Sequence, residues 1–203
     1  MQLLKKYKWT WILLLICVIL AGYLIIENTV KPKFPVINKV QDFTMENVDG
    51  KKVSLSDTSG KVRLFYFYFT SCPDVCPPTT FMLSEVQDLL KENGIFGKDA
   101  SIVSITFDPQ TDTREKIKQW AGKFNADLSG WYFLRGDAQQ TKDFAKNSFK
   151  ILIVGDNKNN FTHANFIALV DRDNNLRKLY SVSNTEEVNA KVIAQDVIDL
   201  ARK

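Results

Sequence analysis

Histidine is almost absent from this sequence, and cysteine and proline are scarce. The 203 residues include one histidine, three cysteines and six prolines, and no proline follows Pro109. The composition has no bias typical of a collagen, a coiled coil or a low-complexity chain, so we expect one globular domain with an appendage. The formal net charge is +4, but residues 1–33 hold five lysines against Glu27 and account for all of it. Because the rest of the chain is neutral overall and has no groove-reading motif, we expect no nucleic acid partner.

The appendage is an unbroken apolar run from Trp9 to Ile26. At about 1.5 Å per residue, this run predicts a helix just long enough to span a bilayer. We expect the lysines before it to keep the N-terminus in the cytoplasm and to place the rest of the chain on the outer side. A cleavable signal peptide is the alternative, but no small-x-small cleavage site follows the run before Glu27.

Cys17 lies inside this run and is interpreted as a small buried apolar residue. A lipid-modified cysteine would follow a small residue, whereas Ile16 precedes Cys17. We therefore predict a single-pass protein of the cell membrane. Residues 1–33 form the cytoplasmic tip, the transmembrane helix and the start of a spacer, and residues 34–203 form the extracytoplasmic domain.

Hydrophobic periodicity beyond residue 40 predicts an α/β domain. Residues 62–69 form a continuous apolar and aromatic run interrupted only by Arg63, which is typical of a strand buried on both faces. Ser183 and Glu186 have the spacing of a capping box for a closing helix. The other patterns predict hairpins around 49–50 and 172–175, strands over 100–107 and 131–136, and helices after the cysteine loop, around 117–124 and over 138–149. This order is thioredoxin-like, with a mixed central sheet and flanking helices.

The stretch "FTSCPDVCPPTT", residues 69–80, contains Cys72 and Cys76 with three residues between them. One hypothesis is a structural disulfide, which an oxidising compartment permits. Closing so small a loop removes only about 2 kcal/mol of chain entropy, which a domain of this size does not need. The other hypotheses use thiolate chemistry. Pro77 and Pro78 suit the first turn of a helix, so the cysteine pair is expected to lie at a helix N-terminus. A helix N-terminus stabilises negative charge, so we expect a lowered pKa at Cys76 in particular.

Two thiolate functions remain open, metal binding and thiol-disulfide exchange. Thioredoxin-like oxidoreductases have two residues between their cysteines and a cis-proline before the strand that faces the active site. This chain has three residues there, and "FTHA", with His163, precedes the candidate strand "NFIALVD". If that strand runs antiparallel to residues 62–69, His163 lies at the same sheet edge as the cysteine loop, where ligands bind in open α/β sheets.

Two thiolates and one imidazole form a soft ligand set that suits copper or zinc. A closed structural zinc site would need a fourth protein ligand, and no further cysteine or histidine exists outside the apolar run. Copper is therefore favoured, because two thiolates hold Cu(I) well and an imidazole helps to hold Cu(II). The same dithiol can be oxidised by Cu(II), so metal binding and disulfide formation compete for the same sulfurs.

Four segments resemble the Sco/SenC family of membrane-anchored copper proteins, over roughly residues 40–200. They are "FYFTSCPDVCPPTT", "SITFDPQTDT", "WYFLRGD" and "THANFIALVDRDN". The resemblance implies a thioredoxin-like fold, a copper site made of a Cys-x-x-x-Cys pair and a histidine, and a role in assembling the binuclear copper centre in subunit II of cytochrome c oxidase. By position, the copper ligands would be Cys72, Cys76 and His163.

Two further positions bear on this resemblance. Many members of the family carry aspartate directly before the histidine, whereas Thr162 stands here. Asp108 matches the aspartate of the family's "DP" stretch, which makes it a candidate outer-shell or fourth ligand. Its plainer interpretation is an aspartate that ends a strand before Pro109 and starts a turn.

Three functional hypotheses follow. The first is a membrane-tethered copper metallochaperone for cytochrome c oxidase, which has no catalytic residues and is not an enzyme. The second is a thiol-disulfide oxidoreductase in which Cys72 and Cys76 are the redox pair, keep the copper-ligating cysteines of the target reduced and are recharged by a thiol reductant. These two roles are compatible in one protein. The third is a binding module with a structural disulfide.

Overall fold

The computed structural model describes four stretches of the chain, residues 7–30, 33–155, 161–182 and 188–202. The chain divides into two compact units, Met1–Pro35 and Val36–Lys203. The capping box predicted at Ser183 and Glu186 lies outside the described residues.

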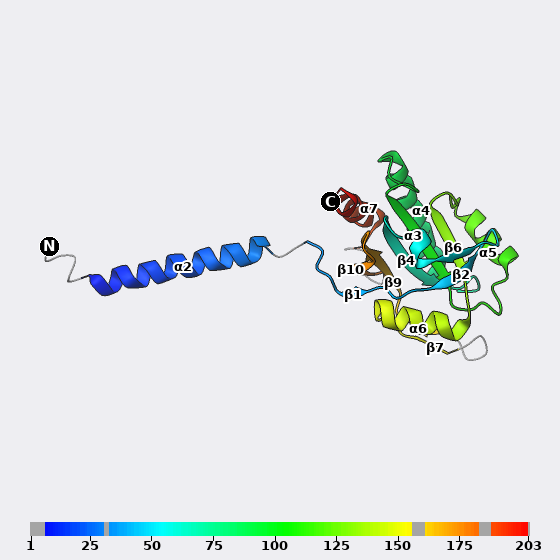
Figure 1. The fold of residues 1–203 in the computed structure, drawn as a ribbon, viewed down its shortest axis with the longest axis horizontal. Coiled ribbons are helices and arrows are strands. Elements are labelled where there is room, and N and C mark those ends of the chain that lie inside the picture. Colours follow the sequence, from blue (N-terminus) through cyan, green and yellow to red (C-terminus); the bar gives the residue numbers. More distant parts are fainter. Residues whose placement is uncertain (1–6, 31–32, 156–160, 183–187, 203) are drawn as a thin grey trace. The chain divides into compact units, whose positions relative to one another are not determined.

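The first unit contains helix α2 (Lys8–Val30), which covers the whole apolar run (Figure 1). None of the helices in the described ranges combines the length and the apolar character needed to cross a bilayer. The predicted transmembrane helix is therefore not confirmed. Cys17 is exposed on α2 rather than buried, because no second described element of this unit packs against the helix.

A mixed sheet of eight strands forms the centre of the second unit, in the order β1-β10-β9-β4-β5-β6-β2-β3. Its central strands β4 (Val62–Tyr68), β5 (Ala100–Thr106) and β6 (Trp131–Arg135) are parallel, and β9 (Phe166–Val170) runs antiparallel to β4. The predicted mixed sheet and both predicted hairpins are confirmed. The remaining strands are β1 (Asn38–Lys39), β2 (Thr44–Asn47), β3 (Lys52–Ser54) and β10 (Asn175–Ser181), with β7 (Ile153–Val154) and β8 (Thr162–His163) forming a separate pair.

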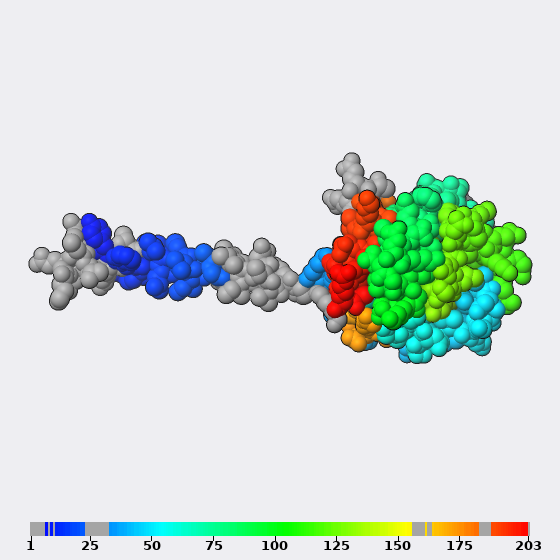
Figure 2. All heavy atoms as spheres, turned by 90° about the horizontal axis from the view of Figure 1, so that it is seen from above, coloured from blue at the N-terminus to red at the C-terminus, as the bar shows by residue number. Residues whose placement is uncertain are grey.

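Helices cover both faces of this sheet. Helices α4 and α7 lie side by side over one face (Figures 1 and 2), and α6 lies over the other (Figure 1). Helix α7 begins after Asn189, whose side-chain oxygen accepts a hydrogen bond from the N–H of Val192 and caps the helix. The described helices of this unit are α3 (Leu55–Thr58), α4 (Cys76–Glu92), α5 (Arg114–Lys123), α6 (Ala138–Phe149) and α7 (Ala190–Ala201).

Strand β4 is buried along its whole length, and its alternating side chains serve two faces of the sheet. Phe65 and Phe67 pack against α6, where the ring of Phe65 lies 5.1 Å from that of Phe149. Tyr66 points the other way, toward the first turn of α4. Because β4, β5 and β6 are parallel, their carboxyl ends share one edge of the sheet, and the loops that follow them meet there. This edge carries the candidate site.

Candidate metal centre

The cysteine loop begins where β4 ends, and the chain brings His163 back to the same edge of the sheet. Strand β9 pairs antiparallel with β4, with Ile167 opposite Tyr66. The start of β9 therefore lies beside the end of β4, and His163 precedes that start by three residues. The structure thus meets the condition under which the sequence analysis placed His163 at this edge. The side chain of His163 lies outside the part of the chain that the structure describes.

A cluster of three phenylalanines joins the segment before His163 to the ends of β4 and β5. The ring of Phe161 lies 5.2 Å from the ring of Phe69 and 5.0 Å from that of Phe107. The rings of Phe69 and Phe107 are themselves 5.2 Å apart. Contacts of this kind bury large apolar areas and favour tilted geometries such as these. The cluster therefore fixes the chain two residues before His163 against the start of the cysteine loop.

A hydrogen bond fixes the chain on the other side of His163. The side-chain Nδ2 of Asn165 donates to Oγ1 of Thr79, in the first turn of α4, at 3.0 Å. The Oδ1 atom of Asn165 is buried and has no hydrogen-bond partner within the described residues. The backbone at His163 is thus held between two anchors, both of which contact the elements that carry the cysteines.

Cys72 and Cys76 are buried, and they form no disulfide in this structure. Cys72 lies in the loop, and Cys76 is the first residue of α4, which has proline in its first turn as predicted. The backbone N–H of Cys76 donates to Sγ of Cys72 at 3.4 Å. The thiol of Cys76 donates a second hydrogen bond to the same sulfur. The loop therefore turns the two sulfurs toward each other, which gives two adjacent soft donors in a nearly dry site.

The charge in this pair resides on Cys72. The hydrogen bond from the Cys76 thiol, helped by backbone N–H groups of Asp74, Val75 and Cys76 and opposed by burial, lowers the pKa of Cys72 to about 5. The pKa of Cys76 is raised, because it donates its proton to Cys72 and because it is buried. The prediction of a lowered pKa at Cys76 is therefore wrong. The N–H groups at the start of α4 point at the sulfur four residues earlier and not at the sulfur of the first helical residue.

Asp112 ties the cysteine loop to the neighbouring strand, a role that the sequence analysis missed. Its carboxylate is fully buried and accepts hydrogen bonds from the backbone N–H of Thr70, at 3.1 and 3.2 Å, and from the hydroxyl groups of Thr70 and Thr106. Burial raises the pKa of Asp112, against the effect of these hydrogen bonds. A threonine at the end of each strand, followed by an acidic loop, was the signal available in the sequence.

Asp108 forms part of a turn after β5, as its plainer interpretation predicts. It is buried, its N–H donates to Oγ1 of Thr106 at 3.1 Å, and its carbonyl oxygen accepts the N–H of Asp112 at 2.9 Å. No three His, Cys, Asp or Glu side chains of the described residues form a group that could hold a metal ion. Of the four predicted site residues, the structure thus brings together the side chains of Cys72 and Cys76. The ligand role of Asp108 stays a prediction.

Tyr66 is a further neighbour of the site that sequence reasoning did not select. Burial, and then the adjacent Cys76, raise the pKa of Tyr66 well above its ordinary value. Its hydroxyl lies beside Cys76 and Thr79 but makes no well-formed hydrogen bond to any described residue. A hydroxyl-bearing residue within a mostly apolar strand was the signal available in the sequence. Its ring and neutral hydroxyl help to keep water away from the sulfur of Cys76.

Comparisons with known proteins agree with this fold. The SCO1/SenC family model matches residues 35–198. The SCO1 protein homolog of Bacillus subtilis (strain 168) is 35% identical over 156 residues, which cover 75% of this chain and 79% of the relative. The crystal structure of a SCO1/SenC family lipoprotein from Bacillus anthracis str. Ames matches with a TM-score of 0.74 and 32% identity, over 85% of this chain and 98% of that one.

Two more solved structures carry functional descriptions of their own proteins. BsSco, described as a member of the Sco family of cytochrome c oxidase assembly proteins with a disulfide switch, matches with a TM-score of 0.72 and 32% identity, over 83% of this chain and 97% of that one. ScoI of Arabidopsis thaliana, solved with copper bound, matches with a TM-score of 0.67 and 25% identity, over 80% of this chain and 97% of that one. With the family model covering most of its length, this chain belongs to the SCO1/SenC family.

Proposed function

We propose that this protein is a copper metallochaperone that binds copper through Cys72, Cys76 and His163 and assists assembly of the binuclear copper centre in subunit II of cytochrome c oxidase. The observation that carries the proposal is the pair of adjacent, reduced sulfurs at the sheet edge to which β9 returns the backbone of His163. A relative in the same family has been solved with copper bound, and another is described as a cytochrome c oxidase assembly protein.

The donor set fits copper as the cargo of this site. Cys72 is held as a thiolate, so its sulfur can accept a soft cation without first losing a proton. Binding by both sulfurs then releases the remaining thiol proton from Cys76. Two thiolates suit Cu(I), and an added imidazole extends the set toward Cu(II). The surrounding aromatic rings keep the site apolar, which strengthens the interaction of the thiolates with a cation.

A second function, thiol-disulfide exchange, is favoured by the unequal protonation of the two cysteines. The Cys72 thiolate can attack a disulfide of the target, so that an S–S bond forms between them and one target thiolate leaves. Cys76, after losing its proton, can then attack Cys72, which forms the internal disulfide and releases the second target thiolate. The target is reduced by two electrons and the protein is oxidised by two, so a thiol reductant must restore the pair.

His163→Ala separates these two functions. In the full chain, we expect the variant to keep Cu(I) binding through its two sulfurs and to lose most of its Cu(II) affinity together with the visible thiolate-to-Cu(II) absorption, because the only imidazole donor is gone. Thr162→Ala, which changes the neighbouring residue of β8, serves as the matched control. Titration with each copper ion and the rate of disulfide exchange are the measurements. Unchanged Cu(II) absorption with an altered exchange rate would remove His163 from the metal site and favour the oxidoreductase.

We also propose that the apolar run from Trp9 to Ile26 holds the domain at the cell membrane, with the N-terminus in the cytoplasm. The support for this part is the sequence alone, namely the length of the run and the lysines that precede it. One relative is described as a lipoprotein, whereas Ile16 before Cys17 does not suit lipid attachment here. The run itself is therefore the proposed anchor.

A further inference from the structure

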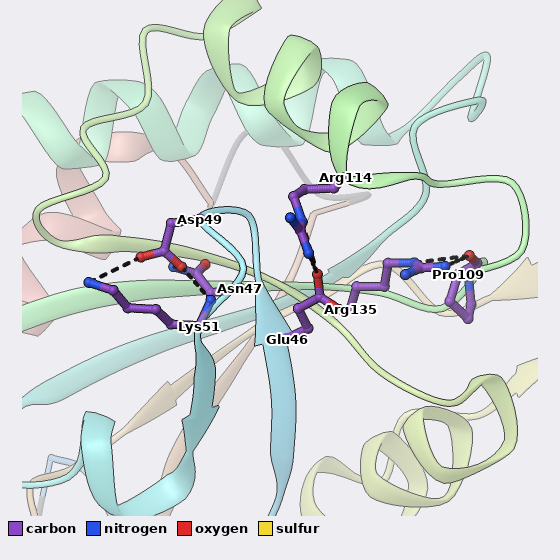
Figure 3. A network of polar contacts seen from close by, with 7 residues as sticks. All are labelled: Glu46, Asn47, Asp49, Lys51, Pro109, Arg114 and Arg135. Carbon is purple, nitrogen blue, oxygen red and sulfur yellow. Dashed lines mark hydrogen bonds and ion pairs between the residues drawn. The ribbon is translucent and has the colours of Figure 1, made fainter.

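A row of alternating charges crosses three strands at the β3 side of the sheet. In register, Lys52 of β3 lies opposite Glu46 of β2, and Glu46 lies opposite Arg135 of β6. Residues paired in this way share one face of the sheet and are close neighbours. Arg114, the first residue of α5, reaches over the same row and donates to Oε1 of Glu46 through Nε, at 2.9 Å, and through Nη2 (Figure 3). Three cations therefore surround a single carboxylate.

These four charged residues line a cavity of about 560 Å³. The other residues that line it carry no charge, so its walls have a net charge of +2 from three cations and one carboxylate. The chain beyond residue 33 is neutral overall, which makes this positive charge a local feature. Volumes of this size are typical of small-molecule sites. The cavity shares no residue with the cysteine loop.

Each arginine of the cavity donates two hydrogen bonds to a single oxygen atom. Nε and Nη2 of Arg135 donate to the carbonyl oxygen of Pro109, at 3.0 and 2.9 Å, and Arg114 uses the same two atoms on Glu46 (Figure 3). Within the described part of the chain, Nη1 of neither arginine donates a hydrogen bond, and the ammonium group of Lys52 has no partner. The site thus has three cationic groups with donors that no described residue uses, two of them guanidinium groups that a hydrogen-bond partner already orients.

Two glycines shape the walls of the cavity. A Cβ atom at Gly50 would lie 3.2 Å from Nη1 of Arg114, and the φ of +87° at Gly50 disfavours any larger residue. The guanidinium group therefore lies directly over the turn between β2 and β3. A Cβ atom at Gly136 would lie 3.0 Å from Cγ of Met45, a buried core residue that alternates with Glu46 along β2 and faces the other side of the sheet, so a glycine lets the chain pass close to it.

From this arrangement we infer that the cavity binds a small organic phosphate monoester. Guanidinium groups match the oxygens of phosphate in geometry and charge, and a phosphate dianion balances the net charge of the walls. The volume exceeds what a bare oxyanion needs, which leaves room for the organic part of the ligand. Glu46 braces Arg114 and at the same time repels an anion, so it sets the affinity below the maximum that the cations allow. A metal cation is disfavoured by the three positive charges.

The test is titration calorimetry on the full, reduced, copper-free chain at constant ionic strength. The probes are glycerol 3-phosphate as the monoester, inorganic phosphate as the bare ion, and glycerophosphoglycerol as the phosphodiester of a lipid headgroup. We expect the monoester to bind most tightly. Equal or tighter binding of the diester would overturn the assignment to a monoester, as would tighter binding of inorganic phosphate. Absence of heat with every probe would overturn the site itself.

Variants identify the residues that bind. Arg114→Gln and Lys52→Gln are each expected to weaken monoester binding by about tenfold or more, the usual size of a lost charge-assisted hydrogen bond. Glu46→Gln is expected to tighten monoester binding, because the repelling carboxylate is removed.

The matched control is Lys118→Gln, which removes the same charge at an exposed position of α5 outside the cavity and is expected to have no effect. Weaker binding in Glu46→Gln, or an equal loss in Lys118→Gln, would contradict the proposed geometry. Lys52 is exposed and lacks a partner among the described residues, so its variant keeps the test valid if an arginine variant does not fold.

Discussion

One proton makes the two sulfurs of the site chemically unequal. Cys76 keeps it and donates it toward Cys72, which receives further hydrogen bonds from the backbone at the start of α4. The helix N-terminus is often expected to activate the cysteine in its own first turn. Here the loop of three residues folds back, so the same N–H groups serve the sulfur that lies outside the helix. The reactive residue is therefore Cys72, and the buried Cys76 is its proton donor.

This inequality predicts how the stability of the reduced protein depends on pH. The pKa of Cys72 is about 5 in the folded chain and returns to its ordinary value of 9.0 on unfolding. Between these values the unfolded state binds the extra proton, so the free energy of unfolding is expected to rise as pH increases and to fall as pH decreases through the folded pKa. Denaturant unfolding across this range measures the effect. Cys72→Ser is expected to flatten the rise, and Cys17→Ser to preserve it. A rise as steep in Cys72→Ser as in the wild type would assign the effect to other groups.

At the scale of elements, the ends of β4 and β5 are joined by Asp112. Asp112→Ala is expected to lower the free energy of unfolding by about 3 kcal/mol, because it removes the acceptor for the backbone N–H of Thr70 and for the hydroxyl groups of Thr70 and Thr106. Asp112→Asn keeps one acceptor oxygen and is expected to cost less. Both should also weaken copper binding, because Thr70 no longer fixes the start of the cysteine loop. Chemical denaturation and copper titration of each variant are the measurements.

Glu92→Ala is the matched control for these variants, since Glu92 is an exposed acid near the end of α4. It is expected to change neither stability nor copper affinity. A large loss of stability in Asp112→Ala with unchanged copper affinity would show that Asp112 supports the fold without positioning the cysteines.

The elements themselves were largely predictable from the sequence. The continuous apolar run of β4 indicates a strand that is buried on both faces. The spacing of Ile117, Trp120 and Ala121 indicates a helix that is buried along one stripe. These two patterns have different periods, so each leaves little choice of secondary structure. The edge position of His163 was expected on the condition that β9 returns antiparallel to β4, and the structure meets this condition. These features depend on hydrophobic pattern and chain order, which a single sequence contains.

The parts of the site that were not predictable depend on contacts between distant residues. Asp112 meets Thr70 across 42 positions of sequence, and Asn165 meets Thr79 across 86. No local pattern encodes such pairs. The pKa order of Cys72 and Cys76 depends on which sulfur the N–H groups face, and that direction follows from the conformation of the loop. Composition and spacing thus identified the cysteines as a reactive pair without showing which of them is charged.

At the scale of the whole molecule, the division into two units predicts that membrane attachment depends on the first unit and metal binding on the second. The described core of the second unit lies between its sheet and its helices and includes no residue of α2, so a fragment of residues 34–203 is expected to fold alone and to remain soluble. The full chain is expected to sediment with membranes, because it retains the apolar run. Fractionation of cells that express each form is the measurement. A fragment that aggregates with its cysteines intact would contradict the independence of the second unit.

Copper that binds only the folded state should stabilise the fragment by about 2.7 kcal/mol at a hundredfold excess of free metal over its dissociation constant. Oxidation of Cys72 and Cys76 to a disulfide is expected to remove this gain, since neither sulfur can then bind the metal as a thiolate. Thermal unfolding of the fragment in its reduced, oxidised and copper-loaded forms is the measurement. A copper-dependent gain in stability that survives oxidation would contradict the proposed ligands.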